Sequence, residues 1–130
     1  MYSITINTHA REEFIDISAE VKQAVAASGI KDGLCTVYIP HTTAGVTINE
    51  NADPSVKSDM LMAMKKMAPD SLPYSHTEGN SPAHIKASLM GPSVCIIIEN
   101  NRLVLGTWQG IFFCEFDGPR SRRVHMTCRE

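Results

Sequence analysis

Side chains that can bind ligands or move protons gather in three places along the chain. In chain order, these are residues 41–53 with His41, Thr42, Thr43, Asn49, Glu50 and Asp53, residues 75–87 with His76, Glu78, Asn80 and His84, and residues 108–123 with Trp108, Gln109, Glu115, Asp117, Arg120, Arg122 and Arg123. Each cluster falls at the end of an expected strand or at a junction between a strand and a helix, where scaffolds commonly place functional loops. We therefore treat the three clusters as candidate parts of a site.

The middle cluster leads into an expected helix. Pro82 suits the first turn of a helix, where free backbone N–H groups and the helix dipole favour an anion. His84 then lies in that first turn and shares its face with small residues that leave room for a ligand. We expect Ile85 and Leu89 to face the core.

The same cluster also contains groups that can bind a metal ion. His76 and Glu78 point the same way if the chain is extended there, and Gly79 allows the chain to turn back toward His84. The spacing of the two histidines is not diagnostic of zinc. Taken alone, the segment fits a polar loop with Asn80 or Ser81 as the helix cap better than a metal site.

The first and third clusters both suit an anion. His41 follows a proline that ends an expected strand, and Thr42 and Thr43 can donate hydrogen bonds to an oxyanion; a turn with threonine-to-backbone bonds explains them equally well. Arginines bind phosphate or carboxylate through two hydrogen bonds, so Arg120 and Arg122 form a candidate anion clamp. A solvated turn or a salt-bridged subunit contact is the alternative for these arginines. Trp108 and Gln109 precede them along the chain.

Composition restricts the class of protein. The chain has 130 residues, of which 43% are hydrophobic and 20% charged, and its formal net charge is -2. These values are typical of a globular domain that spans residues 1–130 and does not bind nucleic acid. The apolar runs are too short to cross a membrane and the N-terminus lacks the features of a signal peptide, so we expect a cytoplasmic protein. The four widely spaced cysteines suit reduced core residues.

Periodicity predicts an α+β fold, with mostly antiparallel strands and two or three helices on one side. Residues 5–17 predict a hairpin, and Ser18 and Gly29 predict the two ends of a helix. Asp53 with the following proline predicts the start of a second helix, whose methionines repeat at helical spacing and are expected to fill the core. The remaining elements are a short helix over residues 82–91 and strands over 34–39, 44–49, 94–98, 102 onward, 108–116 and 123–128.

Four stretches together resemble the YjbQ family, also called UPF0047, over nearly the whole chain. They are HTTAGVTINENADP (residues 41–54), YSHTEGNSPAHIKA (74–87), LGTWQGI (105–111) and EFDGPR (115–120). The resemblance implies a compact subunit in a homotrimer, with the polar clusters near subunit boundaries and a divalent metal, zinc or magnesium, bound by histidines. It also implies an activity like that of thiamine-phosphate synthase, which joins a pyrimidine diphosphate to a thiazole phosphate and releases pyrophosphate.

We therefore expect a trimeric enzyme that acts on a small phosphorylated or anionic metabolite. Its expected metal ligands are His76, His84 and His41. Its expected catalytic residues are His41, Glu78, Asn80 and Glu115, and its expected substrate-binding residues are Thr42, Thr43, Asn49, Trp108, Gln109, Arg120 and Arg122. Two alternatives remain open at this point: a noncatalytic trimer that binds a metal or an anionic metabolite, and a metal-dependent hydrolase.

Overall fold

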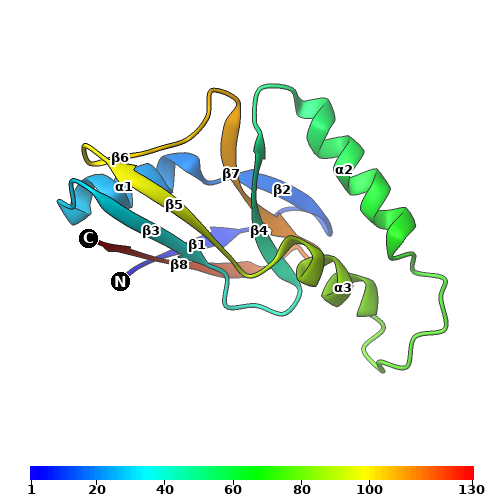
Figure 1. The fold of residues 1–130 in the computed structure, drawn as a ribbon. Coiled ribbons are helices and arrows are strands. Elements are labelled where there is room, and N and C mark those ends of the chain that lie inside the picture. Colours follow the sequence, from blue (N-terminus) through cyan, green and yellow to red (C-terminus); the bar gives the residue numbers. More distant parts are fainter.

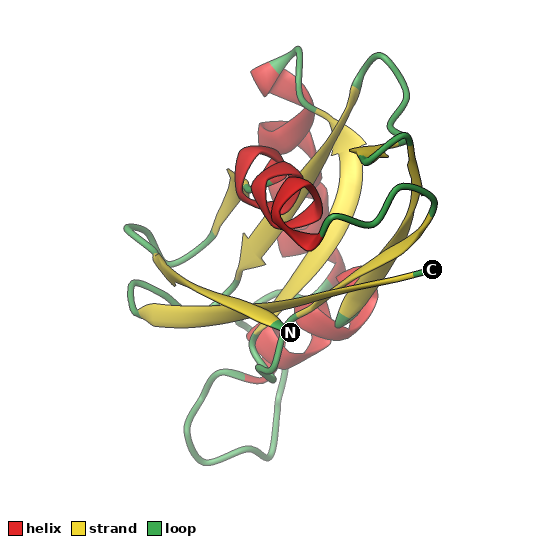
Figure 2. Cartoon of the chain, turned by 90° about the vertical axis from the view of Figure 1, so that its left-hand side faces the viewer, coloured by secondary structure: helices red, strands yellow, loops and turns green.

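The computed structural model describes all 130 residues and contains two antiparallel sheets and three helices (Figure 1). The larger sheet has the strand order β1 (Tyr2–Asn7), β8 (Ser121–Arg129), β3 (Gly33–Tyr38), β5 (Ser93–Glu99) and β6 (Arg102–Leu103). The smaller sheet has the order β2 (Glu13–Asp16), β7 (Gln109–Glu115) and β4 (Ala44–Glu50). Figure 2 shows the strands in yellow with the helices in red packed beside them. The predicted α+β fold with antiparallel strands is confirmed, but the helices lie on both faces of the smaller sheet and not on one side.

The predicted hairpin over residues 5–17 is wrong, because its two strands lie in different sheets. β1 pairs with β8, so that Tyr2 lies opposite Met126 and the two chain ends are close together (Figure 1). β2 instead pairs with β7, where Phe14 lies opposite Cys114. Alternation of apolar residues identifies a strand that is buried on one face, but it does not identify the strand's partner.

Helix α1 (Ser18–Ser28) begins one residue earlier than predicted and ends where predicted. Ile17 occupies the N-cap position, and the hydroxyl of Ser18 instead accepts a hydrogen bond from the backbone N–H of Ile111 at 2.9 Å. Gly29 has φ 69° and caps the C-terminus in the left-handed conformation. The helix thus buries its apolar face against the sheets and is tied to β7 through Ser18.

Helix α2 (Pro54–Met67) begins as predicted but buries less of its methionine stripe than expected. The carboxylate of Asp53 accepts a hydrogen bond from the N–H of Ser55 at 2.9 Å and caps the helix. Met64 is the one buried residue of the helix, while Met67 is 65% exposed. The expectation that the stripe fills the core is therefore confirmed for Met64, holds in part for Met60, which packs against the same core, and is wrong for Met67.

Helix α3 (Ser81–Met90) turns a different face to the core from the one we expected. Ile85 and Leu89 are exposed, whereas Lys86 is buried. The ammonium group of Lys86 reaches Glu12, in the loop between β1 and β2, at 3.0 Å. A buried charge requires a partner, so this ion pair fixes which face of α3 turns inward.

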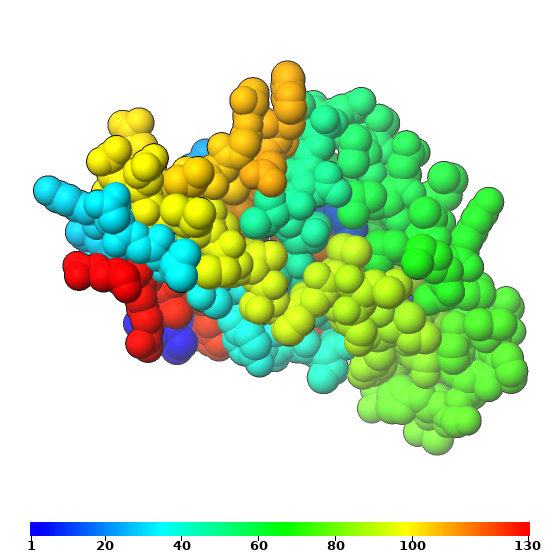
Figure 3. Space-filling model, in the orientation of Figure 1, coloured from blue at the N-terminus to red at the C-terminus, as the bar shows by residue number.

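The smaller sheet lies between two hydrophobic cores. The first core fills the space between the two sheets and includes the apolar face of α1; the second lies between the smaller sheet and helices α2 and α3. β7, the central strand of the smaller sheet, is buried from Gly110 to Glu115 as a consequence. Helices α2 and α3 and the loop between them form a lobe that projects from the sheets (Figure 3). None of the three helices has the length and apolarity of a membrane-spanning helix.

The turn between β5 and β6 is held by its two asparagines. Asn100 and Asn101 have φ 54° and 60°, the left-handed conformation that the sequence predicts for this turn. The side-chain amide of Asn101 donates hydrogen bonds to the carbonyl oxygens of Val25 and Ile30, at 3.0 and 2.7 Å. The turn thereby satisfies carbonyl groups at the C-terminal end of α1.

Candidate functional site

The turn after β3 and the helix α3 form the walls of one hollow. Its volume is about 310 Å³ and its lining residues are His41, Thr42, Ala44, His84, Ala87, Ser88 and Pro92. The cyan turn and the yellow-green helix lie beside each other in Figure 3. α3 can lie this close to β4 because Gly45 has no side chain: a Cβ atom there would be 2.8 Å from the carbonyl oxygen of Gly91. The first and second clusters of the sequence therefore meet, at His41 and His84.

A second hollow shares His41 with the first. Its volume is about 490 Å³ and its lining residues are Tyr38, Pro40, His41, Thr42, Thr43, Arg120 and Arg122. The third cluster therefore contributes its arginines to the same part of the molecule. His41 and Thr42 belong to both hollows. The two hollows together can therefore bind a ligand that has an anionic part and a second polar part.

Glu115 and Arg122 form a fully buried ion pair beneath this surface. The guanidinium Nε of Arg122 is 2.9 Å from the carboxylate of Glu115, and its Nη2 donates to the hydroxyl of Thr43 at 2.8 Å. Glu115 also accepts a hydrogen bond from Thr8 at 2.8 Å and from the backbone N–H groups of Phe116 and Asp117. Burial raises the pKa of Glu115, but its hydrogen bonds from Arg122 and Thr8 and the charge of Arg122 outweigh burial and lower the pKa overall.

The burial of this pair argues against the catalytic role predicted for Glu115 and the substrate-binding role predicted for Arg122. Glu115 is 0% exposed and its oxygens are already hydrogen-bonded, so it is poorly placed to exchange a proton with a ligand. Arg122 is 3% exposed and its charge is already neutralised. Because Arg122 comes from the larger sheet and Glu115 from the smaller one, the pair ties the two sheets together. Its geometry favours a positioning role for both residues.

Arg120 remains available to a ligand. Its side chain is 50% exposed, and it is oriented by Asp117, whose carboxylate is 3.2 Å from Nη2 and whose carbonyl oxygen accepts from Nε at 2.9 Å. The carboxylate of Asp117 also accepts a hydrogen bond from the side-chain amide of Asn80 at 2.9 Å. Asn80 occupies the N-cap position of α3, but its side chain makes no capping bond. Its side chain therefore connects α3 to the arginine turn, and its buried Oδ1 has no partner.

His41 is held by the backbone of the larger sheet. Its Nε2 accepts a hydrogen bond from the backbone N–H of Arg123 at 2.9 Å. Burial of the ring and the nearby charge of Arg122 lower the pKa of His41 from its ordinary value. Together they outweigh the charge of Glu115, which raises the pKa. The ring is therefore neutral at pH 7 and is fixed in orientation.

His76 and His84 lie next to each other without forming a complete metal site. Their rings are in an edge-to-face arrangement with centroids 5.3 Å apart, and the carboxylate of Glu78 is 4.0 Å from Nε2 of His76. The chain has no group of three or more His, Cys, Asp or Glu side chains that could hold a metal ion. Catalytic zinc sites use three protein ligands. One chain therefore provides two neighbouring histidines and not the predicted set of three ligands, because His41 does not join the other two.

Asn49, Trp108 and Gln109 lie at the opposite end of the smaller sheet. In the pairing of β4 with β7, Ala44 lies opposite Glu115 and Glu50 lies opposite Gln109, so the strand length separates the two ends by roughly 20 Å. The amide of Asn49 is 3.2 Å from the sulfur of Met60, Gln109 accepts from the N–H of Gly106 at 2.8 Å, and Trp108 is 63% exposed. Within one chain, these three predicted substrate-binding residues do not join His41.

Two features of the site were not predicted. Thr8 accepts a hydrogen bond from the N–H of Arg120 at 2.9 Å as well as donating to Glu115, and Tyr38 lines the second hollow. Thr8 falls at the break of the predicted hairpin, and Tyr38 falls in the predicted strand over 34–39. A buried threonine directly after a strand has no distinguishing sequence pattern, so only the pairing of β1 with β8 reveals the role of Thr8.

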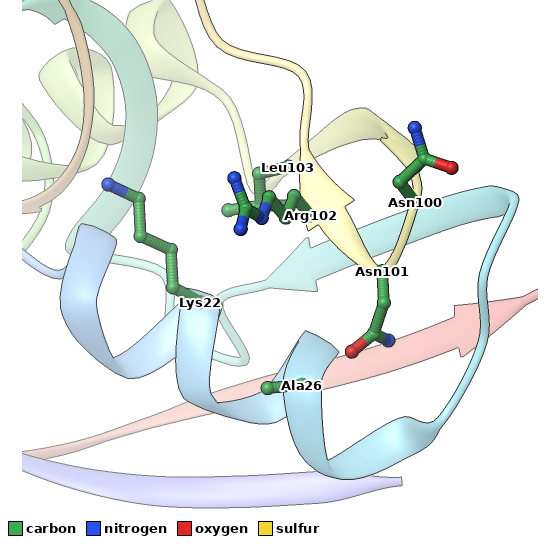
Figure 4. A pocket seen from close by; sticks show the side chains of 6 residues that line it. All are labelled: Lys22, Ala26, Asn100, Asn101, Arg102 and Leu103. Carbon is green, nitrogen blue, oxygen red and sulfur yellow. The ribbon is translucent and has the colours of Figure 1, made fainter.

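The largest cavity lies elsewhere and contains none of the predicted site residues. It has a volume of about 660 Å³ and lies between α1 and the turn from β5 to β6, with Lys22, Ala26, Asn100, Asn101, Arg102 and Leu103 around it (Figure 4). Its two cationic side chains come from opposite walls, but it contains no histidine, carboxylate or hydroxyl group. We favour the smaller hollows at His41, because they combine imidazole, hydroxyl and guanidinium groups.

Comparisons with known proteins agree over nearly the whole chain. Residues 2–130 match the sequence model of the family described as UPF0047 protein YjbQ-like. The chain is 51% identical to a UPF0047 protein of Methanocaldococcus jannaschii, covering 97% of this chain and 91% of that protein, and 51% identical to the UPF0047 protein YugU of Bacillus subtilis, covering 95% of each.

Solved structures show the same fold. A crystal structure of a YjbQ/UPF0047 family protein from Clostridium acetobutylicum superposes with a TM-score of 0.98 at 55% identity, covering 99% of this chain and 100% of that one. A structure from Sulfolobus solfataricus, described as a YbjQ-like protein of unknown function, gives a TM-score of 0.94 at 33% identity and covers 98% of this chain and 94% of that one.

Proposed function

The chain belongs to the YjbQ/UPF0047 family, and we propose that it is an enzyme that binds a small phosphorylated or otherwise anionic metabolite at His41. The observation that carries this proposal is the meeting of two hollows at His41, one with the guanidinium group of Arg120 and the other with His84 and Ser88. Such a pair of hollows can hold an anionic group and a reacting group side by side.

The reaction that we propose first is formation of thiamine phosphate. In this reaction, a pyrimidine diphosphate and a thiazole phosphate are joined, the bond from carbon to the diphosphate oxygen breaks, and pyrophosphate leaves with the bonding electrons. Departure of pyrophosphate requires neutralisation of negative charge. Arg120 is half exposed and already oriented by Asp117, so it can supply a positive charge without further ordering.

A metal ion is a further part of the proposal, with His76 and His84 as its ligands from one chain. A divalent cation would supply charge neutralisation to a phosphate group. The two histidines would need additional ligands from water or from a second chain, because the chain provides no cluster of three. Glu78 is the nearest carboxylate to them, at 4.0 Å from His76.

We also propose that the protein is a cytoplasmic homotrimer in which a second chain completes the site. Asn49, Trp108 and Gln109 are too far from His41 to act on the same ligand within one chain. Trp108 is 63% exposed, and Ile97 on the outer face of the larger sheet is 58% exposed. Burial of such side chains in a subunit interface would stabilise an assembly. Light scattering that gives the mass of a single chain would contradict the trimer.

A noncatalytic binding protein is the second candidate. The observation in its favour is that Glu115, a predicted acid or base, is buried and fully hydrogen-bonded. This function predicts saturable binding of pyrophosphate or of a metal ion without any product.

The experiment that separates these functions uses purified protein with both substrates of thiamine-phosphate synthase. The enzyme predicts release of pyrophosphate together with thiamine phosphate, and His84→Ala should lower both the rate and the metal content of the protein. His9→Ala is the matched control, because His9 is exposed and lines neither hollow. An unchanged rate and metal content in His84→Ala would contradict the site. Cleavage of a single phosphoester that chelators abolish would instead indicate a hydrolase.

A further inference from the structure

The orientation of the His41 ring is set by one hydrogen bond. The backbone N–H of Arg123 in β8 donates to Nε2 at 2.9 Å. Turning the ring by 180° would place the carbon Cε1 at this position and leave the N–H without an acceptor. A doubly protonated ring would also lose the bond, because its Nε2 would carry a proton that faces another N–H. Both considerations require an unprotonated Nε2.

The position of the proton follows from this bond. A neutral imidazole has one nitrogen that donates and one that accepts, so Nδ1 of His41 carries the proton. The ring makes no other hydrogen bond within the chain, and Nδ1 is not one of the two buried polar atoms that lack a partner. The Nδ1–H group is therefore free to bond a ligand.

The surroundings of His41 identify the kind of ligand atom. His41 lines both the hollow that contains Arg120 and the hollow that contains His84. Arg120 and Thr42 line one hollow together with His41, and their guanidinium and hydroxyl groups can donate hydrogen bonds. A third donor at His41 would complete a set of groups that suits an oxyanion.

We propose that His41 acts as a neutral hydrogen-bond donor, through Nδ1–H, to an oxygen of the bound phosphate or carboxylate group. It is then neither a general base nor a metal ligand, because one nitrogen lone pair is used by Arg123 and the other nitrogen is protonated. The identity of the acceptor rests on the proposed function, whereas the protonation pattern of the ring does not. Such a donor stabilises negative charge that develops on the oxygen and transfers no proton.

The protonation pattern can be measured without any ligand. Long-range correlation of ring protons with ring nitrogens in ¹⁵N-histidine-labelled protein at pH 7.5 distinguishes the two neutral tautomers, and loss of the signals in His41→Asn assigns them. We expect the tautomer with the proton on Nδ1. A proton on Nε2, or a doubly protonated ring, would overturn the proposal.

The role in binding can be measured with pyrophosphate as the probe. Asparagine places an amide N–H close to the position of Nδ1–H, whereas alanine removes the donor. By calorimetry, we expect His41→Ala to weaken pyrophosphate binding by about ten- to a hundredfold and His41→Asn by less than about tenfold, with His9→Asn unchanged. Equal losses in the alanine and asparagine variants, or a lower metal content in His41→Asn, would overturn the donor role. Absence of pyrophosphate binding by the unchanged protein would instead contradict the proposed function, and the tautomer measurement would still decide the state of His41.

Discussion

The two ends of the smaller sheet carry the same kinds of residues in very different surroundings. At one end, Glu115 is buried among hydrogen-bond donors and holds Arg122 and Thr43 in place. At the other end, Trp108 and Gln109 are exposed, and the side chain of Gln109 bonds only to its own loop. Polar residues at the first end are therefore part of the fold of a single chain. Those at the second end are available to another molecule.

Removal of the buried charge should give the largest difference between the two ends. Glu115→Ala leaves Arg122 buried without a counter-charge, which typically costs about 3–5 kcal/mol of the free energy of unfolding. Gln109→Ala should change it by less than about 0.5 kcal/mol, because Gln109 is exposed. Urea denaturation of both variants measures this contrast. Similar small losses in the two variants would contradict the structural role of the ion pair.

Glycine substitutions should give the next largest contrast. A Cβ atom at Gly118 would be 2.3 Å from the carbonyl oxygen of Ala10, which belongs to the backbone and cannot move alone. A Cβ atom at Gly110 would be 2.8 Å from the side chain of Asn51, which is exposed and can turn away. We expect Gly118→Ala to cost about 1–3 kcal/mol and Gly110→Ala about 1 kcal/mol or less. Thermal and urea denaturation provide the test, and a larger loss at Gly110 would reverse the comparison.

Acid should weaken the His41 end gradually. The folded state lowers the pKa of both His41 and Glu115, so the unfolded chain binds more protons and stability falls as the pH falls. For His41, the loss begins below its ordinary pKa of 6.5; for Glu115, it begins below 4.5 and continues through its folded pKa. In His41→Gln, the free energy of unfolding should depend less on pH between 7 and 5. An equal slope in the variant and the unchanged protein would contradict this assignment.

Local sequence patterns predicted which helices, strands and turns the fold contains. They predicted less well which of these elements lie next to each other. The cap at Gly29, the helix start at Asp53 and the turn at Asn101 depend on a few adjacent residues, and the structure confirms them. The pairing of β1 with β8 depends on residues more than a hundred positions apart, and it was missed. The same distinction explains α3, where the buried ion pair of Lys86 with a distant glutamate overrides the apolar pattern.

The candidate site was predicted in part for the same reason. From residue types and positions at strand ends, we predicted that His41, His84 and the arginines would come together. In the structure, His41, His84, Arg120 and Arg122 line neighbouring hollows. They did not show that Arg122 is neutralised, since that depends on which strand of the larger sheet faces the end of β7. Nor did they show that residues 44–50 would keep Asn49 and His41 apart, because a strand of that length separates whatever its two ends carry.

The cap that Asn101 places on α1 has a consequence for the order of folding. Helix α1 ends at residue 28, yet the amide that bonds its terminal carbonyl groups is more than seventy residues later in the chain. Closing so long a loop costs entropy that local helix formation alone does not recover. The last turn of α1 should therefore become ordered only after the strands around Asn101 have assembled, so that Asn101→Ala would speed unfolding and leave the folding rate almost unchanged.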